Sequence, residues 1–205
     1  MEDIEEHRLK VRQLFKRANQ YNGIANIGEI ARRYFAMNAF DGVLTIIGML
    51  MGNLSAGIDN PHIVITTGLS TCVAMGISGL WGSYLTESAE RKRDLDELSH
   101  STLTDLNNSS IGKASRFAAV VVSVVDGVSP FLAAILVLLP FFFHSLFSSI
   151  RVVYFASLGL ALLTLFGLGI FLGKISKENL IISGVKTVVA GLASILISTL
   201  MNGSA

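Results

Sequence analysis

The sequence has few of the charged residues and cysteines that are typical of soluble or disulfide-stabilised proteins. Only 15% of its 205 residues are charged, whereas soluble domains average about 25%, and 51% are hydrophobic. A single cysteine, Cys72, excludes an internal disulfide and any multi-cysteine metal site. The net charge of +1 gives no general basis for binding nucleic acid. Met1 to Gln20 has no apolar stretch and no small-residue cleavage site, so we expect no secretory signal.

Long apolar runs are what the sequence has instead. Each is about 20–28 residues, enough to cross roughly 30 Å of hydrocarbon as a helix. The five runs extend from about Tyr34 to Gly57, His62 to Thr86, Ser115 to Phe143, Val152 to Gly173 and Leu180 to Met201. The sequence therefore predicts an all-α, multi-pass integral membrane protein of the cell membrane, with five transmembrane helices in residues 30–205.

Charged segments flank these runs. Residues 1–29 are predicted to form a cytoplasmic segment with an amphipathic helix on the membrane surface, since apolar residues such as Leu9 and Phe15 recur among Glu, Lys and Arg. The second span continues into a charged helix at 87–98, within a short cytoplasmic helix and loop at 87–114. Lys and Arg concentrate before the first span and after the second and fourth, so the positive-inside rule places the N-terminus inside and the C-terminus outside.

Three ionisable residues stand out deep inside the predicted spans: Asp41, Asp126 and Lys186. Such residues are costly in hydrocarbon and mark functional sites by default. Counted from the cytoplasmic ends of their helices, all three lie roughly 10–17 Å deep, so they could meet in one layer. Asn38 and Thr45 share the face of Asp41 at helical spacing. We expect these five residues to line a transport path, although an Asp126–Lys186 pair that only fixes helix packing is the alternative.

Further candidate metal ligands follow the second span. Four carboxylates recur at helical spacing on one face of the charged helix: Glu87, Glu90, Asp94 and Glu97. Together with Asp41, Asp126 and the thioether of Met75, they are the predicted metal ligands. The alternatives are a salt-bridged, solvated helix, because Glu87–Arg91 and Arg93–Glu97 are i,i+4 pairs, and a Met75 that only fills the core.

The first span carries a family resemblance. Asp41-Gly42-Val43-Leu44-Thr45 followed by Met49-Leu50-Met51-Gly52 resembles the signature of the vacuolar iron transporter family. Small residues from Gly76 to Ser88, Pro140 in the third span, and Lys186 with Gly191 in the fifth resemble the family as well. The resemblance covers most of residues 30–200. It implies a homodimeric five-span protein that moves ferrous iron, often manganese, in exchange for protons, with Asp41 in the path.

The chain also departs from the family pattern. Phe40 stands where the family has Asn, Ser83 where it has a second-span Glu, and Gly79 where it has Met. Only about 28 residues join spans two and three, so the family's large cytoplasmic metal-binding insertion is absent. Asp126 is not part of the family pattern, and we hypothesise that it replaces the missing Glu.

These observations predict a transporter of divalent metal ions, Fe²⁺ or Mn²⁺, that exchanges them for protons. No nucleophile–base pair, phosphate loop or zinc pattern occurs, so we expect neither an enzyme nor a bound cofactor. The expected partners are lipid, divalent metal ions, protons and a second copy of the chain, and no nucleic acid. The alternatives are a non-transporting scaffold or metal sensor with the same fold, and a transporter of a different cation.

Overall fold

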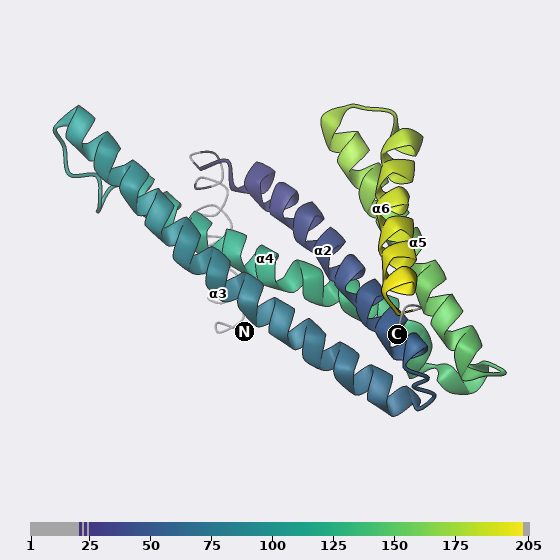
Figure 1. Cartoon of the computed structure of the whole chain (residues 1–205). Helices are drawn as coiled ribbons and strands as arrows, with labels where there is room; N and C mark the ends of the chain where they lie inside the picture. Colours follow the sequence, from purple (N-terminus) through teal and green to yellow (C-terminus); the bar gives the residue numbers. More distant parts are fainter. Residues whose placement is uncertain (1–20, 22, 24, 203–205) are drawn as a thin grey trace, which may run out of the picture. The chain divides into compact units, whose positions relative to one another are not determined.

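The computed structural model describes residues 21, 23 and 25–202, and the long regular elements among them are all helices. The five long helices are α2 (Ile27–Ser55), α3 (Pro61–Thr102), α4 (Ser110–Phe142), α5 (Ile150–Ser176) and α6 (Leu180–Asn202) (Figure 1). A short 3₁₀ helix, His144–Leu146, joins α4 to α5. Each long helix is long and apolar enough to cross a membrane, which confirms the predicted all-α fold with five spans. The predicted amphipathic helix lies in residues 1–20, outside the described residues.

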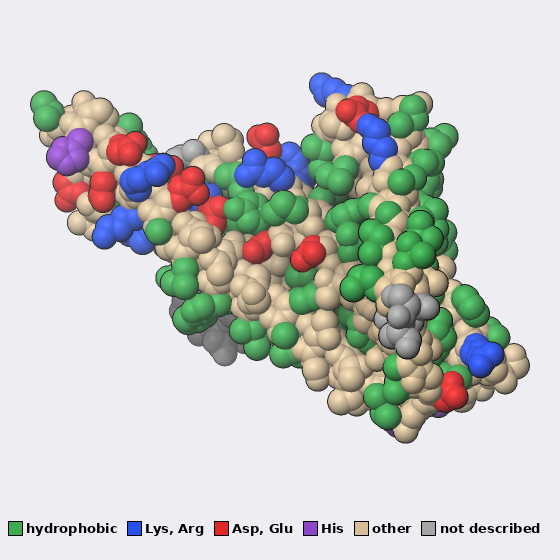
Figure 2. Space-filling model, viewed as in Figure 1, with side chains coloured by type: hydrophobic (Ala, Val, Ile, Leu, Met, Phe, Trp, Pro, Cys, Tyr) green, Lys and Arg blue, Asp and Glu red, His purple; other side chains and the backbone are tan. Residues whose placement is uncertain are grey.

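The helix α3 is much longer than a membrane span requires. Its 42 residues extend over roughly 63 Å, about twice the hydrocarbon thickness. The charged half, after Thr86, therefore projects beyond the membrane as one continuous helix, as predicted. Figure 2 shows red, blue and purple charged side chains gathered over this outer half of α3. We call the side to which α3 projects the extension side.

The residues form two compact units. Of the described residues, those up to Tyr34 form the first unit together with Leu80–Val125, and Phe35–Gly79 form the second with the residues from Asp126 onward. Each unit has its own set of contacts, and each is described separately below.

The first unit contains the outer part of the α3–α4 hairpin. Its loop is held by short polar contacts: the Leu106 amide donates to Ser99 Oγ at 3.3 Å, and the Arg116 guanidinium donates to the Asn107 carbonyl at 3.1 Å. A Cβ at Gly112 would stand 2.6 Å from the Leu106 and Asn107 carbonyl oxygens, so this close turn requires glycine. Hydrogen bonds from the Asn107 amide and side chain lower the pKa of Asp105 in this loop.

The second unit holds the apolar core. Buried residues of α2, α4 and α5 pack together in it, including Val43, Ile47, Leu138, Phe141 and Leu165. Phe141 meets Tyr154 edge-on, with ring centroids 5.0 Å apart, and the Tyr154 hydroxyl donates to the Ile58 carbonyl at 2.8 Å. This bond attaches α5 to the α2–α3 turn. Large apolar side chains on α6, such as Leu196 and Ile197, remain exposed, as suits a lipid-facing surface.

Close contacts at small residues show which way the helices run in the second unit. On α3, Gly76 faces Gly127 of α4 and Gly68 faces Leu138, so the contacts advance in opposite directions and the two helices are antiparallel. The glycines of α6 lie against α5 in the same antiparallel sense. Small residues permit such close approach of membrane helices, where burial of apolar surface gives little driving force.

Candidate transport path

The helices α2 and α4 bring two polar side chains together in the second unit. The Asn38 side-chain amide on α2 donates a hydrogen bond to the Asp126 carboxylate on α4. Asp126 is buried, with 8% of its surface exposed, and Asn38 is half-buried. A buried carboxylate needs hydrogen-bond donors, because desolvation is otherwise costly. The contact therefore fixes the position of Asp126 in an apolar part of the chain.

One turn further along both helices, Gly42 packs against Pro130. A Cβ at residue 42 would stand 2.6 Å from the carbonyl oxygen of Pro130 and 2.7 Å from its Cα. Because Asn38 to Gly42 and Asp126 to Pro130 are both steps of one turn, the contacts show that α2 and α4 run parallel. Pro130 has no N–H, so the helical hydrogen bond to the carbonyl of Asp126 cannot form. One hydrogen bond of the α4 backbone is thus missing at the level of the buried acid, although the helix continues through it.

The helix α3 approaches α4 at the same level. A Cβ on Gly79 would lie 3.0 Å from the carbonyl oxygen of Asp126 and 3.3 Å from the Cα of Gly127. A larger side chain at position 79 would push α3 away from α4. The glycine at position 79 therefore lies directly against the main chain of Asp126.

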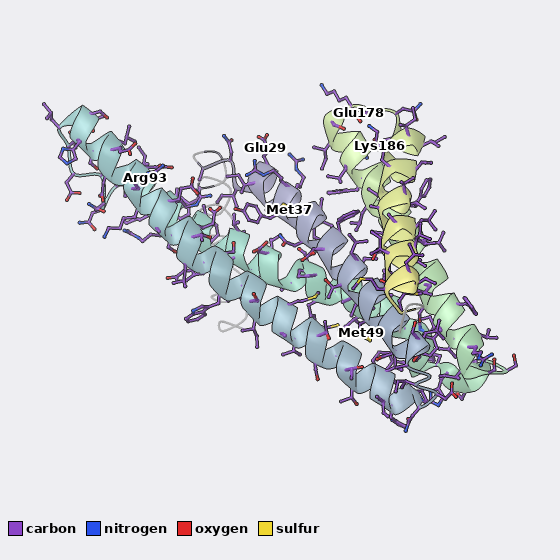
Figure 3. The ribbon with its side chains drawn as sticks, in the orientation of Figure 1. Glu29, Met37, Met49, Arg93, Glu178 and Lys186 are labelled. Atoms are coloured by element: carbon purple, nitrogen blue, oxygen red, sulfur yellow. The ribbon has the colours of Figure 1, made fainter. Side chains whose placement is uncertain are left out.

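Asp41 lies on a different face of α2 from the core. It is exposed within the single chain, Thr45 beside it is half-buried, and Met37 one turn earlier is 59% exposed (Figure 3). A Cβ added at Gly48 or Gly52 would meet nothing within 4 Å. This face, which we call the α2 polar face, comprises Met37, Asp41, Thr45, Gly48 and Gly52. It carries an acid and small residues where a lipid-facing helix would carry apolar side chains.

Lys186 is paired with an acid other than Asp41 or Asp126. Its ammonium lies 3.6 Å from a carboxylate oxygen of Glu178, and both side chains are exposed at the end of the α5–α6 hairpin (Figure 3). Lysine can reach the membrane surface from within a span because its aliphatic stem remains in the apolar region. The ion pair that the structure gives Lys186 is therefore with Glu178, not with Asp126.

The acidic helix after the second span has a salt-bridged arrangement in the first unit. Glu87 is buried and accepts hydrogen bonds from the Tyr34 hydroxyl and from Arg91 Nε, both at 2.8 Å. Arg93 pairs with Asp94 at 3.5 Å and with Glu97 at 3.6 Å. Glu90, Asp94 and Glu97 are exposed. The i,i+4 spacing indicated both the Arg91 and the Glu97 pairs, whereas no sequence signal pointed to the Tyr34–Glu87 contact.

No ready-made metal cluster occurs among residues 21, 23 and 25–202. In that part of the chain, no group of three or more His, Cys, Asp or Glu side chains is positioned to hold a metal ion. Met75 is half-buried and packs against the apolar core, and Met49 Sδ accepts from the Asn53 side chain at 3.0 Å. Ser83 is buried, and its hydroxyl has no hydrogen-bond partner among these residues. The described carboxylates of one chain therefore do not form a three-ligand cation site by themselves.

Comparisons with known proteins identify the family of this chain. The VIT family model matches residues 33–108, which include most of α2 and all of α3. The uncharacterized protein MJ0645 of Methanocaldococcus jannaschii is 33% identical over 169 residues, which cover 81% of this chain and 85% of that protein. The chain belongs to the VIT family. Membership in the VIT family indicates a multi-pass membrane protein that transports metal ions, and it argues against an enzyme. The resemblance of the first span to that family is thereby confirmed.

Proposed function

We propose that this VIT-family protein carries divalent metal ions, Fe²⁺ or Mn²⁺, across the cell membrane in exchange for protons. The observation that supports this most strongly is the buried Asp126, oriented by Asn38 in a membrane-spanning part of the chain. Asp41 lies less than one helical turn beyond Asn38 on α2. Asn38, Asp41, Thr45 and Asp126 line the proposed path, with Asp41 and Asp126 as the metal ligands.

The chemistry of these side chains suits exchange. Carboxylate and amide oxygens are ligands for Mn²⁺, and they accept Fe²⁺ as well. A carboxylate in an apolar setting favours its protonated form, whereas a bound cation favours the ionised form. Arrival of a metal ion therefore releases a proton, and departure of the ion takes one up. The Asn38 amide can turn its nitrogen or its oxygen toward Asp126. It can therefore donate a hydrogen bond to the ionised carboxylate or accept one from the protonated carboxyl group.

A homodimer would complete the site. The α2 polar face leaves Asp41 exposed, which is unfavourable for an acid at membrane depth. Its small residues Gly48 and Gly52 allow another helix to approach closely. A second α2 at this face would cover the acid and add a second Asp41. That pairing would supply an additional carboxylate, since the described part of one chain does not bring three metal ligands together.

The test uses the purified chain in proteoliposomes that contain a pH indicator. An inward Mn²⁺ gradient should drive Mn²⁺ entry and make the lumen more alkaline as protons leave. A parallel assay with Fe²⁺ under reducing conditions should give the same response. Mn²⁺ entry without any luminal pH change, once a counter-ion pathway is supplied, would contradict proton exchange. Absence of flux for either metal in folded protein would favour the scaffold alternative.

A further inference from the structure

A second feature of the chain, separate from the transport path, is a cavity in the first unit. It has a volume of about 500 Å³ and lies in the α3–α4 hairpin, next to the loop. Side chains at helical spacing on one face of each helix line it, together with Asn107 from the loop. We call it the interfacial pocket.

The polar end of the interfacial pocket is positively charged. Arg91, Lys92 and Arg116 line it, and none of the described lining residues is Asp or Glu. Arg91 is partly neutralised by its 2.8 Å contact with Glu87. Within the described part of the chain, Arg116 donates only to a carbonyl oxygen, and Lys92 forms no ion pair. The wall therefore presents two cations without carboxylate partners and a third that is shared, which favours an anion.

The other end of the interfacial pocket is apolar and lies within the predicted membrane spans. Tyr84, Ala119 and Val120 line it. Val120 is 49% exposed, and Trp81 nearby on α3 is 63% exposed. Exposed Trp and Tyr at the end of a span are typical of the headgroup level of a bilayer. The pocket thus changes from apolar to cationic along α3 over roughly 12 Å, the rise from Tyr84 to Lys92.

The α4 helix adds to the anion preference. It begins at Ser110, so its positive end points toward the loop side of the pocket, near Gly112. The partial positive charge at this helix end attracts an anion, as the three cations do. A cavity that is cationic at the membrane surface and apolar toward the hydrocarbon matches an anionic amphiphile better than a soluble anion, which would leave the apolar wall uncovered.

We propose that the interfacial pocket binds the phosphate headgroup of an anionic phospholipid from the leaflet on the extension side. Lys92 and Arg116 contact the phosphate, Arg91 supports it from beside Glu87, and the first part of an acyl chain covers Tyr84 and Val120. Basic pockets between membrane helices bind such headgroups through the same combination of charge and apolar contact. The bound lipid would attach the outer α3–α4 hairpin to the membrane surface.

The experiment measures lipid retention by the full chain in a neutral detergent. Native mass spectrometry counts adducts of phosphatidylglycerol and of phosphatidylcholine on the wild type, on a Lys92→Gln/Arg116→Gln variant and on a Lys113→Gln/Lys174→Gln control. The control removes two exposed cations that do not line the pocket. Thermal unfolding confirms that each variant is folded, and Lys92→Gln alone serves as a second test because Lys92 makes no ion pair among the described residues.

The wild type should retain phosphatidylglycerol in preference to phosphatidylcholine. The double variant should bind it about thirtyfold more weakly and Lys92→Gln about fivefold more weakly, the equivalent of about 1 kcal/mol for each cation. The control variant should bind like the wild type. Equal weakening in the control, or equal retention of the two lipids, would overturn the proposal. Displacement of phosphatidylglycerol by excess inorganic phosphate would also overturn it, because the site would then take a soluble anion.

Discussion

Replacing Gly42 with alanine should disturb both the stability of the chain and its proposed path. The new methyl group would stand 2.6 Å from the carbonyl oxygen and 2.7 Å from the Cα of Pro130. Both are backbone atoms, so no side-chain rotation can relieve the overlap. The contact must lengthen to about 3.4 Å before it becomes an ordinary van der Waals contact, which forces α2 and α4 apart. Asn38 and Asp126 lie one turn away and would separate with them.

The expected loss in the free energy of unfolding follows from two opposing effects. Overpacking of this kind costs about 1–3 kcal/mol, and a backbone overlap belongs at the upper end. Alanine offsets part of it, because it favours a helix over glycine by up to about 1 kcal/mol. A net loss of about 2 kcal/mol should lower the thermal midpoint by about 4–8 °C for a chain of this length. Metal flux in proteoliposomes should fall as well, since the hydrogen bond from Asn38 to Asp126 would break.

The measurement is thermal unfolding of the purified protein in detergent, followed by circular dichroism. Gly167→Ala is the matched control, because a Cβ at Gly167 would meet nothing within 4 Å. The control should unfold at the wild-type temperature or slightly above it. If Gly42→Ala is as stable as Gly167→Ala and transports metal normally, the close α2–α4 contact is not what positions Asp126, and the reasoning fails.

Three further substitutions test separate parts of the account. Asp126→Asn keeps an oxygen that can accept from Asn38, so the fold should persist while metal flux drops at least tenfold; undiminished flux would remove Asp126 from the path. Tyr34→Phe removes the hydroxyl that is hydrogen-bonded to buried Glu87, so it should lower the free energy of unfolding by about 1.5–3 kcal/mol and reduce the thermal midpoint. Tyr84→Phe should change the thermal midpoint little. Lys186→Gln breaks an exposed ion pair worth at most about 1 kcal/mol, so stability and flux should both stay near wild type; a severe loss of flux would place Lys186 in the path after all.

Much of the fold could be predicted because the bilayer imposes strong rules. Apolar runs of span length must form helices, so the five spans and the unbroken passage of the second span into the charged part of α3 followed from the sequence. The boundaries were less certain for a physical reason. The polar residues after Leu98 were predicted to be loop or loose helix, and α3 in fact continues to Thr102. Side-chain hydroxyls there bond to the preceding turn, as in Ser101 to the Glu97 carbonyl at 3.0 Å.

The candidate site was only partly predictable. Helical spacing placed Asn38 near Asp41, but it could not show that Asn38 turns toward Asp126, because that contact depends on the rotation of two helices about their axes. The same ambiguity allowed an Asp126–Lys186 pair, whereas Lys186 extends to Glu178, which follows α5. The sequence also gave no reason to connect Gly79 with Asp126. Only the packed structure shows that this glycine lets α3 approach the main chain of α4 at Asp126.

The most direct test of the central claim compares Mn²⁺ flux through the wild type and through Asp41→Asn in proteoliposomes. Asp59→Asn is the control, since it removes an exposed acid in the α2–α3 turn, outside the helices. If a mobile cation visits the intramembrane carboxylates, Asp41→Asn should abolish flux while the control transports like the wild type. Full flux in a folded Asp41→Asn protein would show that the metal travels by another route, or that this acid has no part in its movement.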